Sequence, residues 1–141
     1  EDVKVVQCKA VEELVRNSDI ICTTTPSTTP VLPDDKELLR GKCIIAIGSY
    51  MPEMREIPDA VLDLVDNVYI ELPYACEESG DLSQPLASGK LTKDRVKLMH
   101  EYLVSGEKEI KEGQTTYFKS VGMGLFDVCI AQKLYEVAKE K

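Results

Sequence analysis

The hydrophobic residues of this chain follow two kinds of spacing, which alternate along the sequence. Short, nearly continuous runs of β-branched and apolar residues recur, and segments with apolar residues at helical spacing separate them. The strand-like runs cover residues 3–6, 19–25, 43–48 and 67–72. Such runs are typical of parallel strands buried on both faces, and parallel strands need crossover connections. The pattern therefore predicts an α/β fold, a Rossmann-like parallel sheet with flanking helices.

Helical spacing predicts the connecting segments. Short helices are expected over 10–17 and 35–39, and Pro58 is expected in the first turn of another helix. Residues 79–89 suggest a short helix and turn. A longer helix is expected over 92–104, with a cap at Thr92, a stop at Gly106 and three buried residues, Val96, Met99 and Leu103.

The last third of the chain predicts a strand followed by a long helix. Residues 116–119 form the strand-like run, and the helix after Ser120 carries a broad apolar face. Its apolar residues include Leu125, Cys129, Leu134, Tyr135 and Ala138.

Composition narrows the class of protein. The 141 residues include 17 basic and 25 acidic side chains, which gives a net charge of −8. This balance argues against a nucleic-acid partner or an anionic membrane surface, because both need a positive field. The longest apolar runs have about five residues, far short of the ~20 that span a bilayer. Five widely spaced cysteines without a C-x-x-C motif favour free thiols and a reducing, cytoplasmic compartment.

Three segments at predicted strand ends are candidate ligand sites, because α/β proteins bind ligands at the carboxyl edge of the sheet. Residues 23–27 (TTTPS) offer three consecutive hydroxyls, residues 47–56 (IGSYMPEMRE) combine a glycine, hydroxyls and charges, and residues 120–124 (SVGMG) join a strand to a helix. Each also has a plain structural interpretation: a polar turn, a loop with solvated Arg55 and Glu56, and an N-cap, respectively.

Three other sequence features are weaker candidates for a functional site. Gly122 and Gly124 begin like G-x-G-x-x-G, but Asp127 occupies the third small position and too few residues follow for a phosphate loop. His100, the single histidine, is expected to have no chemical role, and a metal site is not expected. An acidic group, Glu77, Glu78 and Asp81, is interpreted as a solvated, helix-capping stretch without metal-ligand spacing.

Taken in order, four segments resemble the ornithine cyclodeaminase/mu-crystallin family. They are DIICTTTPSTTPVL (19–32), GKCIIAIGSYMPEMREI (41–57), GDLSQPL (80–86) and YFKSVGMGLFDVCIAQKLYE (117–136). The resemblance implies a substrate and dimerisation domain, a Rossmann domain that holds NAD or NADP, and hydride transfer with a small imino or amino acid. It also implies a homo-oligomer, or pairing with an N-terminal portion.

The resemblance assigns site residues by position. It implies that Thr23, Ile47, Gly48, Ser49 and Tyr50 line the cofactor, that Ser120 meets the nicotinamide end, and that Val121 meets the substrate. Tyr50 stands where cyclodeaminases carry a catalytic Asp, and Met54 stands where they carry a cofactor-contacting Lys. Because a tyrosine is not an anionic base near neutral pH, these differences favour an imino- or amino-acid reductase or dehydrogenase over an ornithine cyclodeaminase.

The resemblance further implies that the chain is a C-terminal portion. Residues 1–105 would be the C-terminal part of the cofactor domain, without its first βαβ unit, and residues 106–141 would return to the substrate domain. Glu1, in place of Met, agrees with a missing N-terminal part. We expect the portion to be inactive alone. The alternatives are a true cyclodeaminase, a mu-crystallin-like ligand carrier, and a non-catalytic assembly module in which the edge strand 3–6 and the terminal helix meet a partner.

Overall fold

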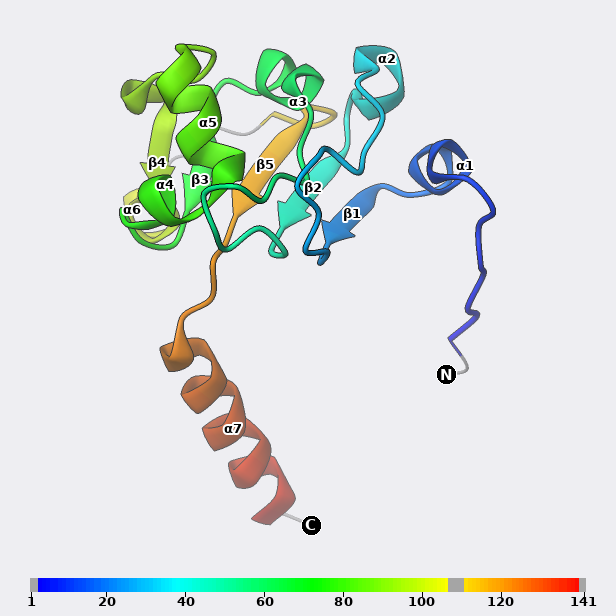
Figure 1. The fold of residues 1–141 in the computed structure, drawn as a ribbon. Coiled ribbons are helices and arrows are strands. Elements are labelled where there is room, and N and C mark those ends of the chain that lie inside the picture. The colour runs from blue at the N-terminus through cyan, green and yellow to red at the C-terminus, as the bar shows by residue number, and fades with distance from the viewer. Residues whose placement is uncertain (1–2, 107–110, 140–141) are drawn as a thin grey trace.

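The computed structural model describes residues 3–106 and 111–139. Its centre is one sheet of five parallel strands in the order β1-β2-β5-β3-β4 (Figure 1). The strands are β1 (Ile20–Thr23), β2 (Cys43–Ala46), β3 (Val68–Ile70), β4 (Val96–Leu98) and β5 (Thr116–Lys119). The predicted Rossmann-like parallel sheet is thereby confirmed.

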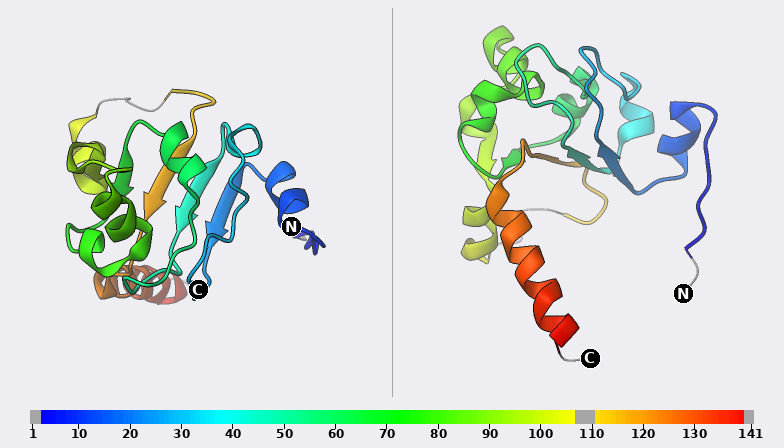
Figure 2. Two further views of the ribbon diagram at one scale, coloured as in Figure 1. Left: turned by 45° about the horizontal axis from the view of Figure 1, so that its top comes forward. Right: turned by 60° about the horizontal axis from the view of Figure 1, so that its bottom comes forward.

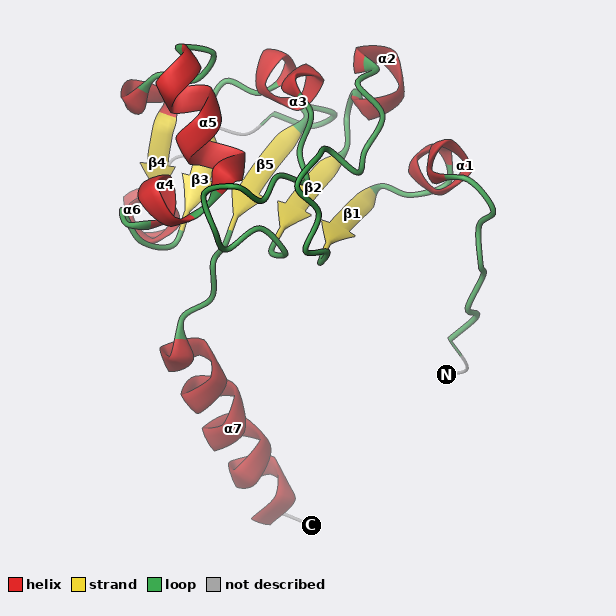
Figure 3. Cartoon of the chain, viewed as in Figure 1, coloured by secondary structure: helices red, strands yellow, loops and turns green. Residues whose placement is uncertain are grey.

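The helices cover the two faces of the sheet unequally (Figures 2 and 3). Four of them pack on one face: α2 (Lys36–Leu39), α3 (Asp59–Leu64), α4 (Ala75–Glu78) and α5 (Gly80–Ser88). The others are α1 (Val11–Arg16), beside β1, α6 (Met99–Ser105), on the opposite face near β3, and α7 (Gly124–Lys139). A 3-10 turn, η1 (Lys93–Arg95), precedes β4.

The alternating side chains of the strands define a buried face and an open face. Ile21, Ile44 and Tyr117 lie in register on neighbouring strands and pack in the core under the helices. The alternate positions of β1, β2 and β5, among them Cys22 and Phe118, are exposed or half-buried, whereas Tyr69 of β3 is buried. On the open face, α6 contributes Tyr102, whose ring lies 5.1 Å from that of Tyr69.

Two predicted elements differ from the structure. Residues 3–6 are exposed and form no strand, so the predicted edge strand is wrong. The helix predicted over 92–104 is divided into η1, β4 and α6. Residues 96–98 pair with β3, and the Arg95 side chain just before them donates hydrogen bonds to three carbonyl oxygens in the last turn of α3 and just after it, those of Leu62, Val65 and Asp66. Leu103, expected to be buried, is 70% exposed, whereas Gly106 does end the helix with φ of 68°.

The terminal helix extends away from the carboxyl edge of the sheet (Figure 1). It begins at Gly124, so Ser120 is not its N-cap. None of its described residues is buried, and its apolar side chains are exposed. Within the described chain, no helix combines the length and apolar character needed to cross a membrane.

Side chains on the two faces of the sheet should differ in how much their truncation to Ala lowers stability. Ile44→Ala should lower the free energy of unfolding by about 2–5 kcal/mol, because Ile44 is fully buried and its loss leaves a cavity. Ile20→Ala, on the adjacent strand but 63% exposed, should change it by less than about 0.5 kcal/mol. Urea denaturation of both variants measures the difference, and equal losses would contradict the assignment of the two faces.

Candidate functional site

Three neighbouring strands, β1, β2 and β5, end side by side at one edge of the sheet. Their last residues, Thr23, Ala46 and Lys119, are in register. The backbone N–H of Ile47 donates to the carbonyl of Thr23 at 2.9 Å, and that of Ser120 donates to the carbonyl of Ala46 at 2.9 Å. The structure therefore brings all three predicted ligand segments to one edge.

The predicted site residues differ in exposure at this edge. Thr23, Ser49 and Ser120 are buried, at 5%, 0% and 7% exposure. Gly48 and Val121 are half-buried. Ile47 and Tyr50 project into solvent, with 43% and 48% exposure. Ile47 and Tyr50 could therefore contact a ligand over their side-chain surface, whereas each buried hydroxyl could contribute one polar atom.

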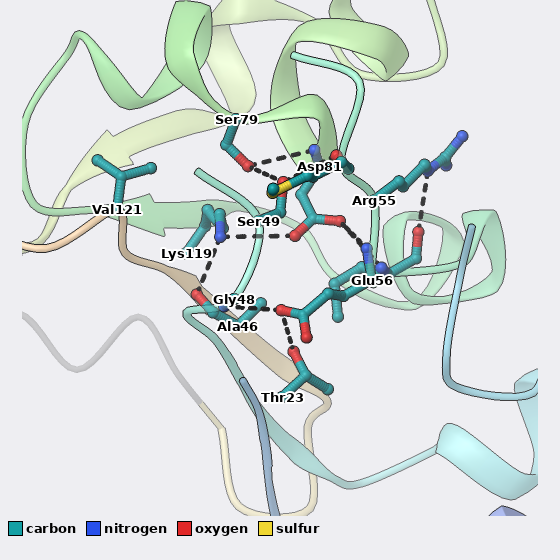
Figure 4. Close-up of polar contacts among 12 residues, drawn as sticks. Thr23, Ala46, Gly48, Ser49, Arg55, Glu56, Ser79, Asp81, Lys119 and Val121 are labelled. Carbon is teal, nitrogen blue, oxygen red and sulfur yellow. Dashed lines mark hydrogen bonds and ion pairs between the residues drawn. The ribbon is translucent and has the colours of Figure 1, made fainter. Parts of the chain in front are cut away.

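A buried carboxylate, Glu56, ties the first two segments together (Figure 4). Its oxygens accept hydrogen bonds from the Thr23 hydroxyl at 2.8 Å, the Thr25 N–H at 2.6 Å and the Gly48 N–H at 2.8 Å. Hydrogen bonds of a carboxylate to backbone N–H groups are among the stronger ones in proteins. Glu56 therefore determines the backbone path of the loops that follow β1 and β2.

Gly48 permits this close approach. A Cβ atom at Gly48 would overlap the backbone of Thr25 and the side chain of Glu56. A residue without a side chain is required here because the two strand-end segments touch through their backbones.

An ion pair between Asp81 and Lys119 lies next to Glu56 (Figure 4). Asp81 Oδ1 accepts from the N–H groups of Glu56 and Ile57 at 2.7 and 2.9 Å, while Oδ2 lies 3.5 Å from Lys119 Nζ. Both side chains have 0% exposure. Burial raises the pKa of Asp81 and lowers the pKa of Lys119, and each partner opposes the shift of the other.

Ser49 is held in the same buried layer. Its hydroxyl donates to the Met54 carbonyl at 2.8 Å and lies 2.8 Å from the hydroxyl of Ser79. Ser79 also accepts from the N–H of Asp81 and begins α5. The loop after β2 is thus attached to the start of α5.

A second buried carboxylate, Glu71, holds the segment after β5. Its Oε1 accepts from the Ser120 hydroxyl at 2.9 Å, the Val121 N–H at 2.6 Å and the Gly122 N–H at 3.1 Å. Its Oε2 is buried and has no donor among the described residues. Glu56 and Glu71 therefore play parallel roles at either side of the site.

The sequence missed these buried charges. It offered a solvated Glu56 as one interpretation and expected a solvated Asp81. The structure buries both, and each accepts hydrogen bonds from backbone N–H groups: Glu56 from Thr25, and Asp81 from Glu56 and Ile57. One signal was available for Lys119: it lies two residues after Tyr117 on a strand, so both point to the core face. His100 is exposed, as is Glu77.

The arrangement suits recognition of a polar small molecule at the carboxyl edge of a parallel sheet. Among the described residues, no cluster of His, Cys, Asp and Glu is arranged to hold a metal ion. All five cysteines are free. The fold and the site together define a Rossmann-like α/β protein.

The family model for the ornithine cyclodeaminase/mu-crystallin family matches residues 1–141, and the chain belongs to this family. It is 37% identical over 132 residues to a Δ1-pyrroline-2-carboxylate reductase of Bacillus cereus, covering 92% of this chain and 40% of the relative. It is 34% identical to the ketimine reductase mu-crystallin of Rattus norvegicus, covering 96% and 40%. An archaeal alanine dehydrogenase dimer with bound NAD superposes with a TM-score of 0.74 at 25% identity, covering 94% and 42%. The chain thus spans about 40% of the length of these curated relatives.

The buried ion pair predicts an unequal outcome for single and double substitutions. Lys119→Met should destabilise the fold by about 3–5 kcal/mol, because Asp81 Oδ2 then remains buried without a countercharge. Adding Asp81→Asn should recover part of this loss, since Asn keeps an oxygen for the N–H groups of Glu56 and Ile57. Urea denaturation measures both values. The partly exposed pair of Lys90 and Asp63 provides the control, and Lys90→Met should cost far less.

A double variant that is no more stable than Lys119→Met alone would contradict this account of Asp81 and Lys119.

Proposed function

We propose that this chain is the carboxyl-terminal part of an NAD(P)-dependent reductase of cyclic imino acids. The observation that carries the proposal is that two buried carboxylates hold polar groups at one strand edge: Glu56 accepts from Thr23 and Gly48, and Glu71 accepts from Ser120. Support comes from the 37% identity to a Δ1-pyrroline-2-carboxylate reductase and from the NAD held by a relative of the same fold.

The residues at the edge fit a dinucleotide. Buried hydroxyl oxygens of Thr23 and Ser120 are suited to polar atoms of a ribose or a carboxamide, and exposed Ile47 provides apolar surface for a flat ring. When bound, the reduced cofactor supplies a hydride. The protein's part is to hold the ring against the imine carbon and to exclude water.

We assign Tyr50 to the substrate side of the cofactor. Its side chain projects from the loop after β2 and is 48% exposed, so it can reach a ligand that lies above the strand ends. A phenol can donate a hydrogen bond to the substrate carboxylate or exchange a proton through water. Val121 is half-buried and follows β5, the strand next to β2.

We also propose how the chain is divided. Residues 1–105, together with β5, belong to the cofactor domain, because β5 is the middle strand of the sheet. The remainder of 106–141, chiefly α7, returns to a substrate and dimerisation domain. The chain alone lacks the hydride-transfer activity, since it spans about 40% of the length of the reductases it matches.

The test joins this chain to the N-terminal portion of the Bacillus cereus reductase. Fluorescence titration with NADH and NADPH, and reduction of Δ1-pyrroline-2-carboxylate, are measured for the joined protein and for the 141-residue chain. We expect binding and turnover in the joined protein and no turnover in the chain alone. Turnover by the chain alone would contradict the division, and a joined protein that binds neither dinucleotide would contradict the proposed function.

Tyr50→Phe in the joined protein separates binding from chemistry. We expect kcat to fall roughly 100-fold or more if the phenol takes part in proton transfer, with the dissociation constant for NADH unchanged. Tyr102→Phe, on α6 at the open face, is the control and should leave both unchanged. If Tyr50→Phe weakened only the binding of NADH, Tyr50 would contact the cofactor rather than the substrate.

An assembly role is a second candidate, favoured by the exposed apolar side chains of α7. They include Ile130 at 62% and Leu134 at 65% exposure, on a helix of 16 residues that none of the sheet elements buries. We propose that α7 packs on the N-terminal portion of a family reductase.

Sedimentation of the chain mixed with that N-terminal portion tests this packing. The wild-type chain should form a complex, and the pair of substitutions Ile130→Lys and Leu134→Lys should abolish it because the charges replace apolar contact. Gln132→Lys adds a charge to the same helix and should retain the complex. A complex that survives the double substitution would exclude α7 as the contact.

A further inference from the structure

The loop after β2 lies against the first turn of α5, and Tyr50 lies between two of the contacts. The residue before it, Ser49, has its hydroxyl 2.8 Å from the hydroxyl of Ser79 (Figure 4). The residue after it, Met51, accepts a hydrogen bond at its carbonyl from the Gly80 N–H at 3.0 Å. Both chain neighbours of Tyr50 are therefore held by two consecutive residues at the start of α5.

The turn of residues 51–54 is attached to the same helix by a side chain. Gln84 donates from Nε2 to the carbonyl of Pro52 at 2.9 Å. The Met54 N–H closes the turn by donating to the Met51 carbonyl at 3.1 Å. The turn is therefore closed on itself and joined to α5 a second time, one helical turn beyond the first contact.

Gly80 lets the loop and the helix approach this closely. A Cβ atom at Gly80 would overlap the carbonyl oxygens of Pro52 and Met54. The helix itself is anchored in the core, because Asp81, the next residue, is 1% exposed and takes part in the buried ion pair with Lys119. The loop that carries Tyr50 thus rests on a part of α5 that is fixed from below.

We infer that Ser79, Gly80 and Gln84 are positioning residues for Tyr50, because they hold the backbone on both sides of it and so determine from which point its phenol projects. Because the Tyr50 side chain is 48% exposed, packing around the ring leaves it much freedom, and the backbone contacts have the larger influence on its position. The inference rests on the proposed function for the part that the phenol plays in the reduction, and it adds the residues that hold the phenol in place.

The first experiment removes one of these three hydrogen bonds between the loop and α5. A displacement of about 1 Å in a reacting group can lower a rate roughly 100-fold. Gln84→Met keeps the length of the side chain and leaves two of the contacts, so we expect kcat of the joined protein to fall by about threefold to tenfold, with the dissociation constant for NADH unchanged.

Gln114→Met is the matched control. Gln114 is also half-buried and donates from its amide to a side-chain oxygen, that of Asp66, but it lies before β5, at the opposite edge of the sheet from Tyr50. This substitution should leave kcat unchanged.

A double-mutant cycle shows whether Gln84 acts through Tyr50. In the Tyr50→Phe background, Gln84→Met should cause no further fall in kcat, because the hydroxyl that Gln84 positions is already absent. An equal fall in both backgrounds, or no fall in either, would overturn the inference while the joined protein still turns over and the proposed reductase function stands. A joined protein that binds neither dinucleotide would overturn the proposed function and, with it, the role of the phenol.

A second measurement needs no cofactor and tests the positioning alone. In the unliganded 141-residue chain, the Tyr50 amide should have an NMR order parameter of about 0.85, the value of rigid backbone. Gln84→Met should lower it, while that of Leu82, whose N–H donates to the Ser79 carbonyl within α5, should stay the same. A value below about 0.6 for Tyr50 in the unsubstituted chain would overturn the inference, whatever the joined protein does.

Discussion

The site depends on one buried carboxylate that collects donors from separate parts of the chain. Glu56 receives the Thr23 hydroxyl and the N–H groups of Thr25 and Gly48, and its own N–H is held by Asp81. Burying an unpaired charge costs several kcal/mol, so Glu56 is stable only when all these segments are in place. The loops after β1 and β2 are therefore not independent: any rearrangement of one removes hydrogen bonds that the other needs.

This dependence joins the loops of the candidate site to one another and to the start of α5. Ser49 is hydrogen-bonded to Met54 within its own segment and to Ser79 outside it, and Ser120 is hydrogen-bonded to Glu71, so each hydroxyl has a contact outside its own segment. Rigid first contacts backed by a second layer of hydrogen bonds are what precise ligand recognition requires. The side chains of Ile47 and Tyr50 lie outside this layer and are the most exposed of the predicted site residues.

Sequence patterns predicted the sheet and the strand-end location of the site, but not the charges beneath it. Runs such as Cys43–Ala46 are recognisable because apolar residues occupy every position, although only Ile44 and Ala46 are fully buried. Glu56 and Asp81 are not, because their burial depends on backbone N–H groups brought close only by tertiary structure. The prediction of a helix over 92–104 was wrong for a related reason. Val96–Leu98 pairs with the strand β3, and no local pattern in the sequence reveals this pairing.

The position of β5 has a consequence for how the chain reaches its native state. β5 is the last strand in sequence, yet it lies between β2 and β3, which pair with it rather than with each other. The strands of the pairs β1-β2 and β3-β4 are all synthesised before the strand that joins the two pairs. The sheet is completed only when residues 116–119 have left the ribosome, and that same step delivers Lys119 to Asp81 and Ser120 to Glu71. Completion of the sheet and completion of the candidate site therefore coincide, although the hydrogen bonds of Glu56 to Thr23 and Gly48 join residues that all precede β5.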